Sequence, residues 1–102
     1  MGARIVRKPG VVYGSGEVVN HSGYRMLAVR QPDISMLEKL GIIGSRVVVS
    51  FETPNGIVSF TARAVREGRV VYFYIPKRLW PSFEDLHHYT GLMMIEVRGG
   101  EP

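Results

Sequence analysis

The chain has 102 residues, of which 45% are hydrophobic and 22% are charged, so it can bury one core and is too short for two domains. It contains no cysteine, which excludes disulfides, thiolate metal sites and thiol nucleophiles. Its formal net charge of +4 favours an anionic partner such as nucleic acid, a phosphorylated cofactor or an acidic protein, although surface charge also serves solubility alone. Ten of the thirteen basic residues are arginine, a bias compatible with a thermophilic source.

The N-terminal residues have the character of a basic arm rather than of a targeting signal. Residues 1–10 carry Arg4, Arg7 and Lys8, and their apolar stretch is too short for a signal peptide. No run approaches the ~18 apolar residues that a membrane span needs. We therefore expect a cytoplasmic protein without a membrane segment, with one domain over residues 11–98 and a short tail over 99–102.

Two strands and a helix are predicted first. Residues 11–19 indicate a strand interrupted by a glycine, serine, glycine kink at 14–16, and a polar turn at 20–23 leads to a second strand over 24–30. Pro32 ends that strand, and Asp33 or Ser35 is the expected N-cap of a short helix that ends at Gly41.

Four further strands and a second helix follow. Residues 46–51 and 57–66 alternate apolar and polar positions around a turn at 54–56, which predicts a hairpin. Residues 70–75 are apolar throughout, so we expect a central strand covered on both faces. After Pro76, Ser82 is the expected N-cap of a helix that runs through His88, and a last strand begins after Gly91.

The second half of this pattern repeats the first with a period of about 45 residues. Each half, 11–52 and 56–98, contains strand, turn, strand, proline, helix, glycine and strand in that order. Neither copy can bury its apolar face alone, but two copies about a pseudo-twofold axis close into a small barrel without free edges. The predicted fold is therefore mainly β, a closed six-stranded barrel with two short helices and an internal repeat.

Two segments carry a family resemblance. The stretch 33–50, with its Leu40, Gly41 and Ile42, followed by a glycine hairpin at 55–56, resembles the cofactor-binding domain of molybdopterin-dinucleotide enzymes. The stretch 75–82, which reads Ile-Pro-Lys-Arg-Leu-Trp-Pro-Ser, is similar to the small D subunit of formylmethanofuran dehydrogenase. This resemblance implies a double-psi barrel that binds molybdopterin guanine dinucleotide beside a separate catalytic subunit.

A dinucleotide site needs cations, free backbone N–H groups near a helix start and a flat apolar surface. The loop after residue 75 supplies these groups, and the turn at 23–25 is its pseudo-symmetric neighbour. The expected cofactor-binding residues are Gly23, Tyr24, Arg25, Pro76, Lys77, Arg78, Trp80 and Ser82.

The same halves also resemble tandem transition-state-regulator (AbrB-like) DNA-binding proteins, through the Ile-Pro-Lys of 75–77 and the glycine-led strand 91–97. That resemblance implies a transcriptional regulator. Basic residues that follow a phosphate backbone make binding strongly salt-dependent. The expected nucleic-acid contacts are Arg63, Arg66, Arg69, Lys77 and Arg78. A protein-adaptor barrel is a third reading, which no sequence feature favours or opposes.

No motif in the chain specifies catalysis. His87 and His88 are adjacent on a predicted helix, about 100° apart, so they are poorly placed to chelate one ion, and we expect no metal site. The serine between Gly14 and Gly16 lacks the strand-to-helix turn of a nucleophile elbow. We expect no catalytic residues and a protein that is not an enzyme by itself.

Overall fold

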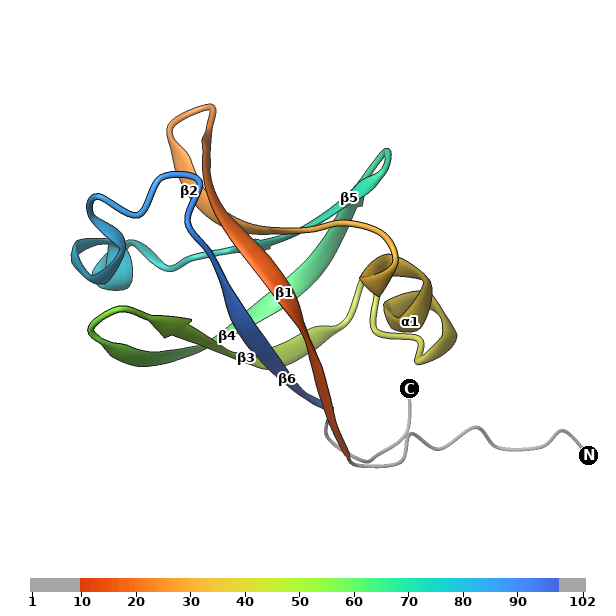
Figure 1. Ribbon diagram of the computed structural model, residues 1–102. Coiled ribbons are helices and arrows are strands. Elements are labelled where there is room, and N and C mark those ends of the chain that lie inside the picture. The colour runs from red at the N-terminus through yellow and green to blue at the C-terminus, as the bar shows by residue number, and fades with distance from the viewer. Residues whose placement is uncertain (1–9, 98–102) are drawn as a thin grey trace, which may run out of the picture.

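The computed structural model describes residues 10–97, which form a closed barrel of six β-strands with two short helices (Figure 1). In space the strands follow the order β1-β2-β5-β4-β3-β6, and β6 pairs back onto β1. All six pairings are antiparallel. The mainly β, six-stranded closed barrel is thus confirmed. The elements in chain order are β1 (Gly10–His21), β2 (Tyr24–Val29), α1 (Asp33–Lys39), β3 (Arg46–Thr53), β4 (Gly56–Glu67), β5 (Val70–Tyr74), the 3-10 helix η1 (Lys77–Phe83) and β6 (Thr90–Val97).

The barrel interior is filled by the alternate residues that the sequence pattern marks as apolar. Val47, Val49 and Phe51 of β3 point inward, and Phe60 and Ala62 of β4 do the same on the neighbouring strand. Such alternation is what one buried and one solvated face require. The basic arm of residues 1–9 and the residues from 98 onward lie outside the described part of the chain.

The strand that is buried on both faces is β2, not β5 as the sequence predicted. In β5, Val71 and Phe73 are buried while Tyr74 is exposed, because the wall of a barrel has an inside and an outside. By contrast, the last four residues of β2, from Met26 to Val29, are all buried. An unbroken apolar run in β5 therefore reflects tyrosines on the outer face rather than a second covering layer.

The predicted interruption of the first strand is also wrong. β1 pairs with β6 without a bulge through Gly14, Ser15 and Gly16, and Gly16 lies directly opposite Gly91. A Cβ at position 91 would lie 2.6 Å from the backbone oxygen of Glu52 and 2.9 Å from the ring of Phe51. Glycine is used here because another part of the chain approaches closely, not because the strand breaks.

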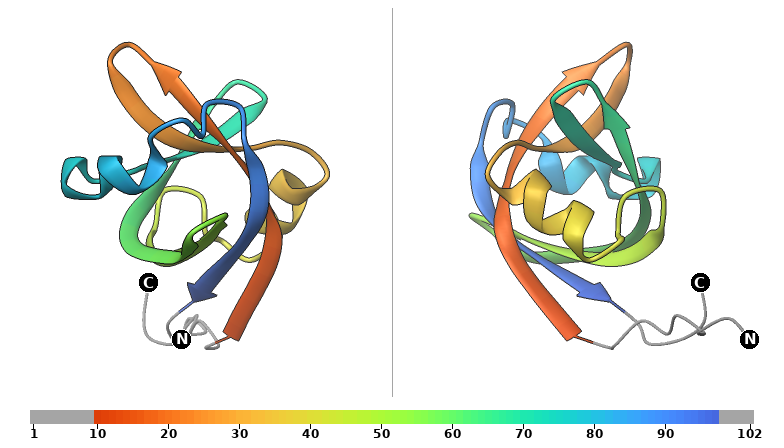
Figure 2. Two further views of the ribbon diagram at one scale, coloured as in Figure 1. Left: turned by 60° about the vertical axis from the view of Figure 1, so that its left-hand side comes forward. Right: turned by 90° about the vertical axis from the view of Figure 1, so that its right-hand side faces the viewer.

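The helices close opposite ends of the barrel (Figures 1 and 2). α1 buries Ile34 and Leu37 in the core at one end. Neither expected N-cap is used, because helix α1 begins after Pro32 with no side-chain cap, and the Asp33 carboxylate instead accepts a hydrogen bond from the Ser15 N–H.

The second helix lies earlier in the chain than predicted and has a different geometry. It is a 3-10 helix over residues 77–83, and the segment predicted as helical, 82–88, contains two residues with positive φ, Asp85 at 63° and His88 at 65°. Pro76 precedes the first turn of η1, where its missing N–H costs nothing. The inward anchor is Phe83, whose ring stacks on Phe51 with centroids 6.0 Å apart.

The strand order is compatible with the predicted repeat. Exchanging the halves turns β1, β2 and β3 into β4, β5 and β6 and reproduces the same six pairings. The connections differ, however, since one half contains an α-helix and the other a 3-10 helix. The double-psi type and the internal repeat are finer claims than a strand order can establish, and they stay predictions.

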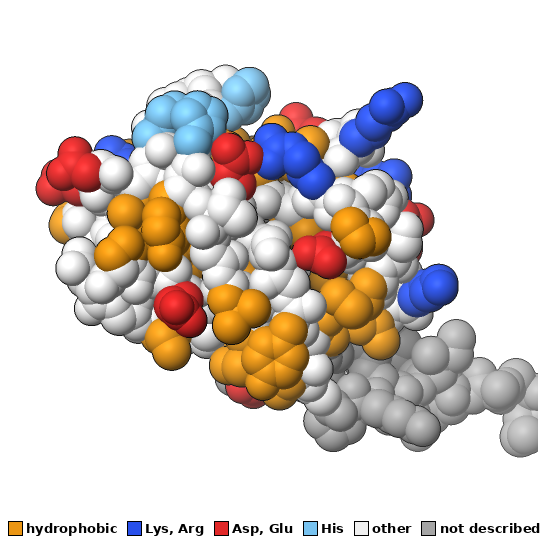
Figure 3. All heavy atoms as spheres, in the orientation of Figure 1, with side chains coloured by type: hydrophobic (Ala, Val, Ile, Leu, Met, Phe, Trp, Pro, Cys, Tyr) orange, Lys and Arg blue, Asp and Glu red, His pale blue; other side chains and the backbone are white. Residues whose placement is uncertain are grey.

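One outer wall of the barrel carries exposed apolar side chains. Val11 and Tyr13 of β1, Leu92 of β6 and Ile57 of β4 are all exposed, Ile57 by 71%. Figure 3 shows apolar groups gathered on the face over β1 and β6. Neither helix between residues 10 and 97 has the length and apolarity needed to cross a bilayer.

The close approach of Gly91 to the backbone of Glu52 leads to a testable prediction. We expect Gly91→Ala to lower the free energy of unfolding by about 1–3 kcal/mol, the usual cost of overpacking, because the new Cβ meets backbone that cannot move cheaply. Urea denaturation followed by circular dichroism measures this. Gly10→Ala in the same barrel is the matched control, since nothing lies within 4 Å of its Cβ, and it should change stability by less than about 0.5 kcal/mol. Equal stabilities of the two variants would contradict the argument.

Candidate functional sites

The two loops predicted to form one site are joined at one end of the barrel. The guanidinium of Arg25, at the start of β2, donates a hydrogen bond from Nη1 to the Phe83 carbonyl at 3.1 Å. The backbone of the same residue accepts a bond from the Ile75 N–H at 3.0 Å. The turn at 23–25 and the two ends of the segment 75–83 are therefore joined by hydrogen bonds. We call this region the barrel-end site.

The barrel-end site contains an oriented aromatic ring with a cation beside it. The indole Nε1 of Trp80 donates to the Ile75 carbonyl at 2.8 Å, which orients a half-buried ring. The Lys77 ammonium lies 5.9 Å from the centroid of that ring, within the range of a cation–π contact. Tyr24 packs edge-on against Tyr74 with centroids 5.7 Å apart, while Arg78 is exposed. Gly23 has a φ of 81°, which the tight turn requires.

The expected helix N-terminus at Ser82 is absent. Ser82 is the sixth residue of η1, not the residue before a helix, and Pro81 beside it has no N–H to offer. Backbone N–H groups at this position therefore do not converge on a ligand. An anion at the barrel-end site would have to be held by side chains, with Pro76 as the rigid entry to η1.

The structure divides the residues expected to contact nucleic acid. Arg63 donates to the Gly44 carbonyl at 2.6 Å, and Arg66 bonds the Gly68 carbonyl at 3.1 Å and pairs with Glu38 at 2.9 Å. Arg69 is exposed in the turn between β4 and β5. In Figure 1 that turn and η1, with Lys77 and Arg78, lie at opposite sides of the barrel. The five cations do not form one patch.

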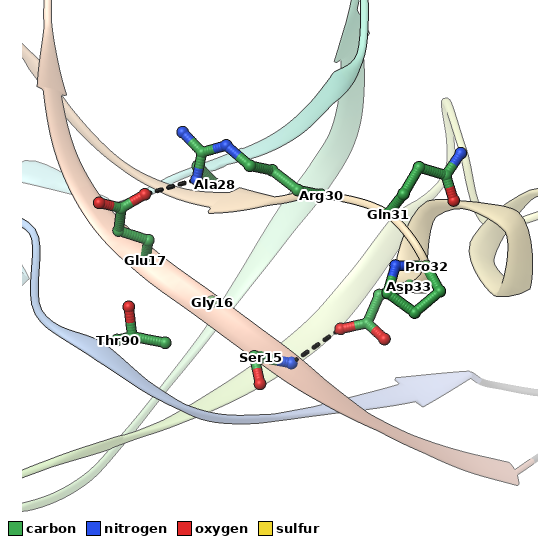
Figure 4. A pocket seen from close by; sticks show the side chains of 9 residues that line it. All are labelled: Ser15, Gly16, Glu17, Ala28, Arg30, Gln31, Pro32, Asp33 and Thr90. Carbon is green, nitrogen blue, oxygen red and sulfur yellow. Dashed lines mark hydrogen bonds and ion pairs between the residues drawn. The ribbon is translucent and has the colours of Figure 1, made fainter.

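A pocket that the sequence did not predict lies on the wall between β1, β2, α1 and the start of β6 (Figure 4). Its volume is about 350 Å³. Ser15 and Gly16 of β1 run between Glu17 and Thr90 on one side and Asp33 on the other. We call it the wall pocket, and its lining residues are Ser15, Gly16, Glu17, Ala28, Arg30, Gln31, Pro32, Asp33 and Thr90.

Glu17 is the electrostatic centre of the wall pocket. One carboxylate oxygen pairs with the Arg30 guanidinium, and the other lies 3.0 Å from His88 Nδ1. The hydrogen bond from His88 is the largest cause that holds the pKa of Glu17 below its usual value, and it and Arg30 together outweigh the burial that raises it. The segment before β6 is held in place as well, because the His88 N–H donates to the Val18 carbonyl at 2.8 Å.

Asp33 forms the opposite wall through a glycine-dependent contact. Its Oδ2 accepts the Ser15 N–H at 3.0 Å, and a Cβ at Gly14 would lie 2.9 Å from that same oxygen. Only glycine lets the carboxylate approach the strand so closely. The sequence predicts a kink at Gly14 and Gly16 and an N-cap role for Asp33, so it does not predict this contact. The signal for it is an aspartate at the start of a helix that uses no side-chain cap.

The histidines do not lie on a helix, so the predicted angle of about 100° between them does not apply. The rings of His87 and His88 are 3.9 Å apart and tilted by 49°. Between residues 10 and 97 the structure contains no group of three or more histidine, aspartate or glutamate side chains suited to hold a metal ion.

Comparisons of the chain with models of known protein families, with curated proteins and with solved structures give no match. The resemblances to molybdopterin-dinucleotide enzymes and to AbrB-like proteins therefore rest on the sequence motifs alone.

The lowered pKa of Glu17 predicts an acid-sensitive contact. The pKa of Glu17 is lower in the folded chain than in the unfolded chain, where it is near 4.5. The carboxylate therefore stabilises the fold at pH values above 4.5, and this stabilisation is lost as the pH falls through the folded-state pKa. We expect Glu17→Gln to unfold more easily at pH 7 and to lose less stability than the parent chain as the pH falls below about 5. Thermal melts over this range measure it.

Glu67→Gln is the control for this experiment, since Glu67 is exposed in the turn at the end of β4. It should keep the acid dependence of the parent chain. If Glu17→Gln also kept that dependence unchanged, the pairing with His88 and Arg30 would have no role in stability.

Proposed function

We propose that the protein is a non-catalytic binding module for a phosphorylated ligand that contains a flat ring, the class to which molybdopterin guanine dinucleotide belongs. The observation that supports the proposal is the hydrogen bond from Arg25 to the Phe83 carbonyl. It joins the turn at 23–25 to η1, the helix that carries the ring of Trp80 and the cation of Lys77. Ring stacking and charge-assisted contacts to phosphate are the two interactions such a ligand requires.

The ligand is expected to lie along η1. Trp80 is already oriented by its bond to Ile75, so stacking a guanine on it costs little side-chain ordering. Lys77 and Arg78 are exposed and can turn toward a pyrophosphate, while Arg25 is fixed by Phe83 and supplies charge without moving. Because no helix N-terminus contributes, binding should depend strongly on these side chains and on ionic strength.

A separate catalytic partner is part of the proposal. The outer wall with Tyr13, Leu92 and Ile57 supports a protein partner, because contiguous exposed apolar groups mark interaction surfaces. Glu52 lines an apolar depression on this wall, which favours a partner surface with an apolar centre and a basic group.

Titration with GDP tests the ligand class. We expect saturable quenching of the fluorescence of Trp80, the sole tryptophan, and a higher melting temperature, with binding weakened about tenfold or more in Arg78→Gln. Arg69→Gln is the matched control, an exposed arginine lost from the other side of the barrel. If GDP leaves both fluorescence and melting temperature unchanged, or if both variants weaken it equally, the proposed site is wrong.

The DNA-binding alternative keeps one specific support, the exposed cations Lys77, Arg78 and Arg69. It predicts a gel shift of duplex DNA at low salt that is lost steeply as salt rises. Arg78→Gln and Arg69→Gln should then each weaken binding to a similar degree. No shift even at low ionic strength would exclude a DNA-binding regulator.

A further inference from the structure

We infer that the wall pocket is a second ligand site, separate from the barrel end, and that it takes a small zwitterion of the α-amino-acid type, with its ammonium group on Asp33 and its carboxylate on Arg30. The pocket volume of about 350 Å³ is at the small end of the range for small-molecule sites, about 300–1,000 Å³.

The negative wall of the pocket selects an amine. Asp33 uses Oδ2 to accept the Ser15 N–H, and its other oxygen has no hydrogen-bond partner among residues 10–97. A half-buried carboxylate with one oxygen fixed by backbone and one oxygen unused is a preorganised acceptor for a charged donor. The contact depends on Gly14, whose Cβ would otherwise meet the carboxylate at 2.9 Å.

The positive wall selects an acid. Glu17 binds one nitrogen of Arg30, and the remaining donors of that guanidinium have no acceptor among residues 10–97. A guanidinium carries five N–H donors in a planar fork, so a ligand carboxylate can still bind side-on. Glu17 is the weaker acceptor for the amine, because both of its oxygens already have partners, Arg30 on one and His88 on the other.

Charge balance separates a zwitterion from other small ligands. Glu17 and Asp33 contribute two negative charges to the lining and Arg30 one positive charge, so the pocket carries a net charge of −1. A free phosphate or dicarboxylate would be repelled from Asp33, and an amine alone would leave Arg30 unused. The hydroxyls of Ser15 and Thr90 at the rim add neutral hydrogen-bonding groups for the rest of the ligand.

The test uses the full chain, labelled with ¹⁵N, and the twenty protein amino acids as probes, with propylamine and propionate as half-ligands. At least one amino acid should shift the amide signals of Ser15 and Gly16 saturably, and each half-ligand should bind at least tenfold more weakly. The absence of any saturable shift, or propylamine binding as tightly as the best amino acid, would overturn the assignment.

Two substitutions test the proposed ligand contacts of Asp33 and Arg30 and are expected to leave the fold intact. Asp33→Asn keeps an oxygen for the Ser15 N–H but loses the charge, and Arg30→Gln leaves Glu17 with His88; each should weaken the amino acid at least tenfold. Arg78→Gln, at the barrel end, should leave amino-acid binding unchanged, so failure of the GDP proposal and failure of this one are distinguishable. Unchanged affinity in both pocket variants would place the bound amino acid elsewhere.

Discussion

The pairing of the first strand with the last is the constraint on which the rest of the structure depends. β1 and β6 run together from Gly10 opposite Val97 to Glu17 opposite Thr90, and this ladder closes the sheet. Closure removes the free edges that an open six-stranded sheet would expose. It also forces the two strands past the β3–β4 hairpin, and this is why Gly91 faces the backbone of Glu52 with no room for a side chain. Closure at this point therefore requires a glycine at position 91.

Closure also creates both candidate sites. Because β6 returns to β1, the segment at 88–89 pairs with Val18, and His88 reaches Glu17 although 71 residues separate them. The segment that leads into β6 also anchors Phe83 in the core, against Phe51. The Phe83 carbonyl accepts the Arg25 bond, so the end of η1 lies against the start of β2. Ion pairs between exposed groups contribute little stability, but Glu17 is only 23% exposed and joins three segments. The main effect of Glu17 is to hold Arg30 in position at the wall pocket.

Much of this architecture could be predicted from the sequence, because alternation of apolar residues reports a local property. The six strands begin and end within a few residues of their predicted limits, and Val47, Val49 and Phe51 are buried as expected. The second helix was misplaced because a spacing of three residues between Phe83 and Leu86 suits a turn as well as a helix. Pro81, inside η1, is tolerated there in a 3-10 segment that has few backbone bonds to lose.

The barrel-end site could be predicted from local sequence patterns, whereas the wall pocket could not. The barrel end joins the turn after β1 with the loop after β5, and the repeat of the pattern was enough to suggest that pairing. The wall pocket joins Ser15, Glu17, Arg30, Asp33 and Thr90, which share no motif and meet only through the β1–β6 register and the exit of β2. A shift of that register by one residue would turn Glu17 to the other face, so no local pattern could reveal it.

The placement of the two sites along β2 argues that they serve different ligands. Arg25 stands at the start of this strand and Arg30 just after its end, five residues apart, so their backbones are separated by roughly 17 Å at the usual rise of a strand. Their guanidiniums also contact different segments, because Arg25 bonds the Phe83 carbonyl and Arg30 bonds Glu17. The last four residues of the strand between them, from Met26 to Val29, are all buried. A ligand held by Lys77, Arg78 and Trp80 and a zwitterion held by Arg30 and Asp33 would therefore bind independently, coupled only through the rigidity of β2.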